Sequence, residues 1–259
     1  MTTLAINHLH VDYQLDGDPE SPVLVLSNSL GTTRQMWAAQ IAAFSKTHRV
    51  LSYDSRGHGG SSAPAGPYTI EQLGQDVLAL VDALQIQTFS FCGISMGGLI
   101  GQWLGVHAAS RLDRLVVCNT AARIGQETAW KERAGLVRSQ GMGPVADGSA
   151  GRWFTAEFVD THPATVATLI AQLRDTPPEG YAACCEALAM ADLREDIKTI
   201  TVPVLVIAGT HDPVTTVDDA DFIAGQASRA KRVALEASHL SNIEAAAAFN
   251  AAVGAFLGD

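Results

Sequence analysis

Five short runs of almost purely apolar residues recur along the chain and limit the folds that it can adopt. They are VLVLSNS (23–29), VLSYDS (50–55), FSFCGIS (89–95), RLVVCNT (114–120) and PVLVIAG (203–209). Strands that helices cover on both faces of a parallel sheet have this composition. Stretches with helical periodicity separate the runs, for example residues 70–86 and 99–109. This order predicts a doubly wound α/β fold with a mostly parallel sheet.

Two segments depart from this rhythm. The N-terminal segment LAINHLHVDYQL (4–15) alternates apolar and polar residues, which predicts an antiparallel hairpin at the sheet edge. From about residue 121 to residue 190 there are helix-like pieces but no strong strand run. This stretch far exceeds a usual crossover connection, so we expect an inserted helical cap. The predicted division is a first core part at 1–121, the cap at 122–190 and a second core part at 191–259.

Composition and charge argue against several classes of function. The chain has 259 residues and a net charge of −10, whereas proteins that bind nucleic acid present a basic face. No apolar run reaches the roughly 20 residues of a membrane span, and the N-terminus lacks the pattern of a signal peptide. We therefore expect a cytoplasmic protein with neither nucleic acid nor membrane as a partner. The four cysteines show no metal-ligand spacing and are expected to be reduced.

A single serine stands between glycines in FCGISMGG, residues 91–98, directly after an apolar run. A G-x-S-x-G match alone is common by chance. Here, however, it lies between a predicted strand and a predicted helix, as a nucleophile elbow requires. Gly93 and Gly97 let the strand and the helix approach each other closely, and the helix N-terminus adds positive potential. We predict that Ser95 is an activated nucleophile.

An activated serine needs a histidine base that an acid orients, and in this fold the chain order is serine, acid, histidine. Asp212 follows an apolar strand run, and His239 follows another predicted strand. Both fall at the carboxyl ends of strands, the edge where open α/β sheets bind ligands. We therefore predict a triad of Ser95, His239 and Asp212. Asp54 and His58 are weaker candidates for acid and base, because both precede the serine.

The oxyanion hole is predicted to consist of two backbone N–H groups. One belongs to Met96, which follows the nucleophile, and the other to Leu30 in the loop LSNSLGTT (26–33). Gly31 gives this loop freedom to turn. A simple strand-to-helix turn is the alternative interpretation.

These motifs together resemble the α/β-hydrolase superfamily over essentially the whole chain, and more narrowly the 3-oxoadipate enol-lactonases. The resemblance rests on LSNSLGTT, YDSRGHGGSS, FCGISMGGLIGQW, NTAARIG, GRWFTAEF, PEGYAACCEAL, ADLR and ASHLSNIE. Where the superfamily pattern usually has His-Gly, this chain has Asn28-Ser29. The cap motifs carry the narrower resemblance, because esterases, haloperoxidase-like enzymes and C–C hydrolases share the core motifs.

The resemblance implies an α/β-hydrolase fold and hydrolysis of 3-oxoadipate enol-lactone to 3-oxoadipate, in the beta-ketoadipate pathway of aromatic-compound catabolism. It implies no cofactor, and it assigns the same triad and the same oxyanion donors. A carboxylesterase, a cofactor-free perhydrolase and a C–C bond hydrolase share the triad and stay open as alternatives. A ligand-binding receptor is the alternative outside catalysis, and the complete set of triad residues speaks against it.

The implied substrate carries a carboxylate, so a basic group is expected near the pocket of this acidic chain. Residues 121–152 contain five basic and three acidic side chains: Arg123, Lys131, Arg133, Arg138 and Arg152 against Glu127, Glu132 and Asp147. On a helix at ETAWKERAGLVRSQ, Arg133 falls within an apolar arc. We predict that Arg133 clamps the substrate carboxylate between walls formed by Trp130 and Trp153. A structural ion pair or a side chain that reaches water is the alternative for Arg133. If loss of Arg133 affects neither the lactone nor a neutral ester, Arg152 or Arg138 becomes the better candidate.

Overall fold

The computed structural model describes residues 2–258, and within this range the chain forms one eight-stranded sheet. Its strands are β1 (Thr2–Ile6), β2 (Leu9–Asp16), β3 (Val23–Ser27), β4 (Arg49–Tyr53), β5 (Phe89–Ile94), β6 (Leu112–Cys118), β7 (Val204–Gly209) and β8 (Ala230–Leu235). They lie in the order β1-β2-β4-β3-β5-β6-β7-β8. The β1–β2 and β2–β4 pairs are antiparallel and the others are parallel. The predicted parallel sheet with an N-terminal hairpin at its edge is confirmed.

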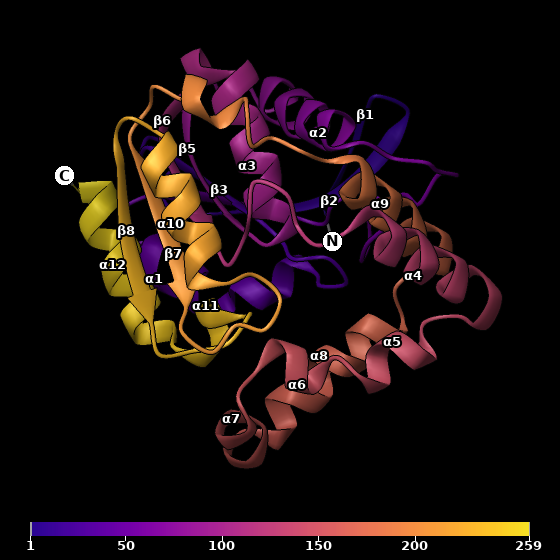
Figure 1. Ribbon diagram of the computed structural model, residues 1–259. Coiled ribbons are helices and arrows are strands. Elements are labelled where there is room, and N and C mark those ends of the chain that lie inside the picture. The colour runs from indigo at the N-terminus through magenta and orange to yellow at the C-terminus, as the bar shows by residue number, and fades with distance from the viewer. Residues whose placement is uncertain (1, 259) are drawn as a thin grey trace.

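Helices cover both faces of the sheet, which explains the apolar strand runs. Every residue of β5 and of β7 is buried, whereas the edge strand β8 keeps exposed positions. The helices outside the segment between β6 and β7 are α1 (Ala38–Phe44), α2 (Ile70–Ala83), α3 (Met96–His107), α10 (Val217–Gln226), α11 (Ser241–Glu244) and α12 (Ala246–Gly258), with short 3-10 turns η1 (Arg34–Trp37) and η2 (Ala109–Arg111). A third 3-10 turn, η3 (Ile197–Thr199), directly precedes β7. Helices α2, α3 and α10 lie on one face, and α1 and α12 lie on the other (Figure 1). Among residues 2–258, no helix has the length and apolarity that crossing a membrane would require.

Six α-helices lie between β6 and β7, and we refer to them as the helical insertion. They are α4 (Glu127–Gln140), α5 (Gly143–Asp147), α6 (Ala150–Trp153), α7 (Ala156–Thr161), α8 (Pro163–Arg174) and α9 (Pro178–Met190). Helix α4 packs along α9, and α5 to α8 extend away from the sheet (Figure 1). The sequence predicted helical pieces here but not the five-residue α5. The division of the chain at residues 121 and 190 stays a prediction.

Candidate active site

The turn from β5 into α3 places Ser95 in a strained backbone conformation. Ser95 has φ +56° and ψ −114°, and positive φ is uncommon for residues other than glycine. A Cβ atom on Gly93 would lie 2.2 Å from the carbonyl oxygen of Gly97, and one on Gly97 would lie 2.3 Å from that of Ser27. Only glycine fits at these two positions. The glycines that flank Ser95 therefore have the steric role that a nucleophile elbow requires.

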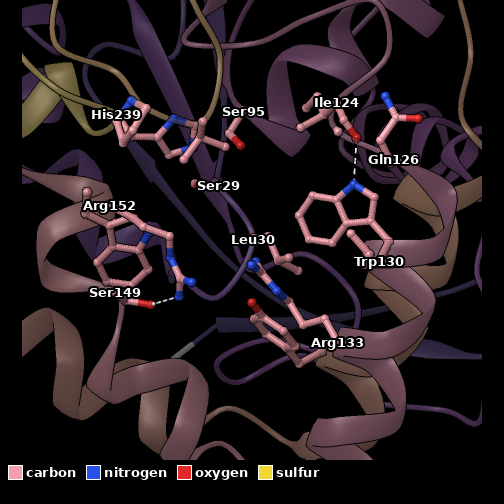
Figure 2. A pocket seen from close by; sticks show the side chains of 16 residues that line it. Ser29, Leu30, Ser95, Ile124, Gln126, Trp130, Arg133, Ser149, Arg152 and His239 are labelled. Atoms are coloured by element: carbon pink, nitrogen blue, oxygen red, sulfur yellow. Dashed lines mark hydrogen bonds between the residues drawn. The ribbon is translucent and has the colours of Figure 1, made fainter.

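A buried histidine–aspartate pair lies beyond the carboxyl ends of β7 and β8. Nδ1 of His239 is 2.8 Å from Oδ2 of Asp212. Because the carboxylate accepts a hydrogen bond from Nδ1–H, the neutral imidazole keeps its lone pair on Nε2. His239 and Ser95 line the same cavity, and Figure 2 shows them on the same side of it. A serine hydroxyl and a histidine that a carboxylate orients thus line one cavity, and nucleophilic catalysis by serine uses these groups.

Several neighbours hold the Asp212 carboxylate in its ionised form. Oδ2 also accepts hydrogen bonds from Asn119 Nδ2 (3.0 Å) and from the Thr215 hydroxyl (2.8 Å). Oδ1 accepts hydrogen bonds from the backbone N–H groups of Val214 (2.8 Å) and Thr215 (3.1 Å). Burial acts to raise the pKa of Asp212, but the charge of His239 and these hydrogen bonds outweigh burial and lower it. Asp212 is therefore a fixed negative charge behind His239.

Two buried backbone N–H groups lie where the oxyanion hole is expected. The N–H groups of Leu30 and Met96 donate no hydrogen bond to any other group within residues 2–258. Unpaired buried N–H groups are rare, so a pair of them next to a serine suits an incoming oxyanion. The following residue, Gly31, has φ +80°, and its N–H donates to Nε2 of His58 at 2.8 Å. Leu30 lines the cavity, and Met96 follows Ser95 directly.

The weaker candidates for acid and base have other contacts. His58 is buried and accepts a hydrogen bond from the Gly31 N–H, so its ring supports the loop at residues 26–33. Asp54 accepts the backbone N–H groups of Arg34 (2.7 Å) and Gly60 (2.9 Å) and thus ties two loops together. The exposed His211, adjacent to Asp212 in the chain, lies 3.1 Å from Glu236. Within residues 2–258, no cluster of three or more His, Cys, Asp or Glu side chains is arranged to hold a metal ion.

The cavity above Ser95 has a volume of about 250 Å³ and is lined partly by the helical insertion. Trp130, Arg133 and Trp153 all line it, and their contact with a substrate stays a prediction. The guanidinium carbon of Arg133 lies 4.9 Å from the centre of the Trp130 ring, within the range of a cation–π contact. The indole N–H of Trp130 donates to the carbonyl oxygen of Ile124 at 2.6 Å, which fixes the ring (Figure 2).

The basic residues predicted in this region divide into two groups. The three that do not line the cavity each have acidic partners: Arg123 with Asp192, Lys131 with Glu127, and Arg138 with Glu179 and Glu186. Arg133 and Arg152 line the cavity, and neither forms an ion pair with an acid within residues 2–258. A structural ion pair for Arg133 is therefore wrong for the described part of the chain. The surface pairing of Arg138 also speaks against a direct role in the cavity.

Sequence reasoning missed three polar side chains that shape the site. Asn119 directly follows β6 with φ +44° and donates hydrogen bonds to both Asp212 and the carbonyl oxygen of Ser238. Thr215 holds Asp212, and Tyr181 of α9 lines the cavity. The only signal for Asn119 was a polar residue directly after an apolar strand run. The contacts of Thr215 and Tyr181 depend on tertiary structure that no local pattern reports.

Comparisons with known proteins agree with this geometry. The model of the alpha/beta hydrolase family matches residues 24–252. The chain is 51% identical to 3-oxoadipate enol-lactonase 2 of Acinetobacter baylyi over 98% of its own length and 96% of that protein's. It is 43% identical to enol-lactonase 1 of the same organism, over 89% and 86% of the two chains. The crystal structure of the enol-lactonase from Burkholderia xenovorans LB400 superposes with a TM-score of 0.98 at 48% identity and covers all of both chains. The chain belongs to the alpha/beta hydrolase family.

Proposed function

We propose that this chain hydrolyses 3-oxoadipate enol-lactone to 3-oxoadipate in the beta-ketoadipate pathway, with Ser95, His239 and Asp212 as its catalytic triad. The observation that carries the proposal is one cavity that Ser95 and His239 line together with two arginines, neither of which has an acidic partner among residues 2–258. A nucleophile with its base suits acyl transfer, and a basic wall suits a lactone that carries a carboxylate. The near-full-length similarity to two 3-oxoadipate enol-lactonases supports this substrate.

The first step forms an acyl-enzyme. His239 takes the proton of the Ser95 hydroxyl at Nε2 while Oγ attacks the lactone carbonyl carbon. Asp212 holds Nδ1 of His239 at 2.8 Å, which fixes the ring orientation and stabilises the imidazolium that forms. The negative charge moves to the carbonyl oxygen, where the N–H groups of Leu30 and Met96 bind it.

Collapse of the tetrahedral intermediate opens the ring. The bond between the acyl carbon and the ring oxygen breaks, and its electron pair leaves on the ring oxygen as an enolate. The proton on His239 passes to this leaving group, and the enol then becomes the ketone. His239 is neutral again, and the acyl group remains on Ser95.

The second step releases the acid. His239 takes a proton from a water molecule while the water oxygen attacks the acyl carbon. The same two N–H groups bind the second oxyanion. When this intermediate collapses, Ser95 leaves and recovers its proton from His239. The product is 3-oxoadipate with two carboxylates.

Arg133 is the group that we assign to the carboxylate of the substrate. Its guanidinium is half-buried, lacks an acidic partner within residues 2–258 and stands over Trp130. A guanidinium presents two parallel N–H donors to a carboxylate, and a partly desolvated site strengthens this contact. Trp130 and Trp153 then form the walls on either side of the lactone ring. A small anionic lactone is the only partner that the proposal needs, and the cytoplasmic location stays a prediction.

Substrate preference tests the proposal. Enol-lactone generated enzymatically is followed by its loss of absorbance, beside hydrolysis of p-nitrophenyl acetate and peroxide-dependent halide oxidation. We expect kcat/KM for the enol-lactone to exceed that for p-nitrophenyl acetate by at least about 100-fold, because only the lactone carries the charge that the cavity recognises. A higher kcat/KM for the neutral ester would indicate a carboxylesterase. Efficient halide oxidation without lactone hydrolysis would indicate a perhydrolase.

A further inference from the structure

Arg152 is a second cation in the cavity, and the reaction described above gives it no role. It lies in the short helix α6 and lines the same cavity as Ser95, His239 and Arg133. No acid within residues 2–258 forms an ion pair with Arg152. Half-buried charges ordinarily have a partner of opposite charge, so a cation that lacks one among residues 2–258 and lines the cavity of Ser95 indicates an anionic ligand.

Contacts within the helical insertion fix one side of the Arg152 guanidinium. Its Nη2 donates to the Ser149 hydroxyl at 2.9 Å and to the carbonyl oxygen of Val145 at 3.1 Å. The Ser149 hydroxyl in turn donates to Val145 at 2.7 Å. Within residues 2–258, Nε and Nη1 of Arg152 donate to no other group, so they stay available to a ligand.

The two arginine side chains approach the cavity from different helices. Arg133 comes from α4 and Arg152 from α6, and Figure 2 shows their guanidinium groups turned toward each other. Both charges act on the buried hydroxyl of Tyr181. Burial and then the charge of Arg133 lower the pKa of Arg152. Two like charges without a counter-ion repel each other in a half-buried cavity, and a ligand with two negative charges would relieve this repulsion.

We propose that Arg152 is a specificity-determining residue that binds a second carboxylate, so that the cavity prefers short aliphatic dicarboxylates to monocarboxylates. This inference rests on the proposed function, in which the lactone enters with one carboxylate and leaves with two. Arg133 holds the carboxylate that is present throughout, and Arg152 receives the carboxylate that hydrolysis releases from Ser95. The open product then contacts both arginines and binds more tightly than it would with Arg133 alone. We therefore expect the product to inhibit the enzyme competitively.

Binding of two matched ligands to the wild-type protein tests this assignment. Adipate and adipamic acid have the same length, but adipamic acid carries a neutral amide in place of one carboxylate. Isothermal titration calorimetry measures the Kd of each ligand. We expect adipate to bind at least about tenfold more tightly than adipamic acid. Comparable Kd values for the two ligands would overturn the proposal.

Variants locate the preference at Arg152. In Arg152→Met the ratio of the two Kd values should fall below about threefold, mainly because adipate binds more weakly. Arg152→Gln keeps a donor toward Ser149 without the charge and should lose the preference in the same way, which provides the test if the Met variant does not fold. Arg174→Met removes an exposed arginine that pairs with Asp147 on the surface and should keep the wild-type ratio. If both Arg152 variants raise the Kd of adipate and of adipamic acid by the same factor, Arg152 only supports the structure of the cavity.

This binding measurement separates the inference from the proposed function. No turnover is needed, so a protein that prefers adipate but does not hydrolyse the enol-lactone would refute the function and leave the dicarboxylate site standing. Conversely, a protein that hydrolyses the lactone and binds both ligands equally would refute the role of Arg152 alone.

Discussion

Oδ2 of Asp212 lies 2.8 Å from Nδ1 of His239, and the same oxygen accepts hydrogen bonds from Asn119 and Thr215. One carboxylate atom thus connects the imidazole to the end of β6 and to the loop after β7. The charge and the position of this atom set the orientation of His239. Removing the charge without changing the shape of the side chain is therefore an informative perturbation.

Asp212→Asn should lower kcat by about 10⁴-fold and leave the fold intact, because an amide at this position can favour the wrong tautomer of His239. Enol-lactone turnover and circular dichroism of the same preparation measure the two effects. Asp218→Asn alters an exposed acid six positions along the chain and should change kcat by less than about twofold. An Asp212→Asn enzyme within tenfold of wild type would show that His239 needs no anionic partner.

Arg133→Ala should raise KM for the enol-lactone by about 10- to 100-fold, because a charge-assisted contact with the carboxylate is lost. Hydrolysis of neutral p-nitrophenyl acetate should change by less than about twofold. Arg174→Ala, on the surface of the helical insertion, is the matched control. Equal losses on both substrates would show that Arg133 supports the structure rather than the substrate. With no loss on either substrate, the carboxylate contact would belong to Arg152.

Two glycine-to-alanine changes should have opposite effects on stability. A Cβ on Gly97 would lie 2.3 Å from a backbone oxygen of Ser27, so Gly97→Ala should cost at least about 1–3 kcal/mol of unfolding free energy and impair turnover. Gly135 lies within α4 and has nothing within 4 Å of its Cβ position, so Gly135→Ala should add about 0.5–1 kcal/mol. Urea unfolding of both variants measures these changes. Equal stability of the two variants would contradict close packing at the elbow.

His58 should make the fold less stable in mild acid. Burial lowers its pKa from the ordinary 6.5 to about 4, so between these values the unfolded chain binds the proton and the folded chain does not. The free energy of unfolding therefore has its full value above about pH 6.5 and decreases as the pH falls toward 4. The expected loss between pH 7 and pH 4 is about 3 kcal/mol from this residue alone.

Urea unfolding as a function of pH isolates the contribution of His58. The stability of His58→Gln should depend less steeply on pH than that of wild type between pH 6.5 and 4, whatever its absolute stability. His10→Gln changes an exposed histidine and should keep the wild-type slope. Parallel stability curves for His58→Gln and wild type would mean that His58 titrates normally in the folded protein.

The sheet and the elbow were predictable because their constraints are local. Strands such as β5 must be apolar on both faces, and the sites next to Ser95 need glycine because a Cβ atom on Gly93 or Gly97 would lie 2.2–2.3 Å from a backbone oxygen. The serine–acid–histidine order then follows from the places where strands end. Helix α5 escaped prediction because five residues that include a glycine and a proline show no periodicity.

The supporting groups could not be predicted, since their roles arise from residues that are distant in the chain. Asn119 forms its hydrogen bond with Asp212, which lies 93 residues further along the chain, and no sequence pattern near Asn119 indicates this contact. The sequence offered five basic residues in the region of the helical insertion and favoured Arg133. Only the pairing of Arg123, Lys131 and Arg138 with acids left Arg133 and Arg152 as the two cations of the cavity.

The central claim is that Ser95 is the nucleophile that opens the lactone. The most direct test is the rate of enol-lactone loss with wild-type and Ser95→Ala protein, each purified free of other hydrolases and checked for an unchanged circular dichroism spectrum. We predict rapid loss with wild type and a fall in kcat on the order of 10⁶-fold for Ser95→Ala, the typical cost of removing a triad nucleophile. A folded Ser95→Ala protein that retains activity within tenfold of wild type would contradict this claim.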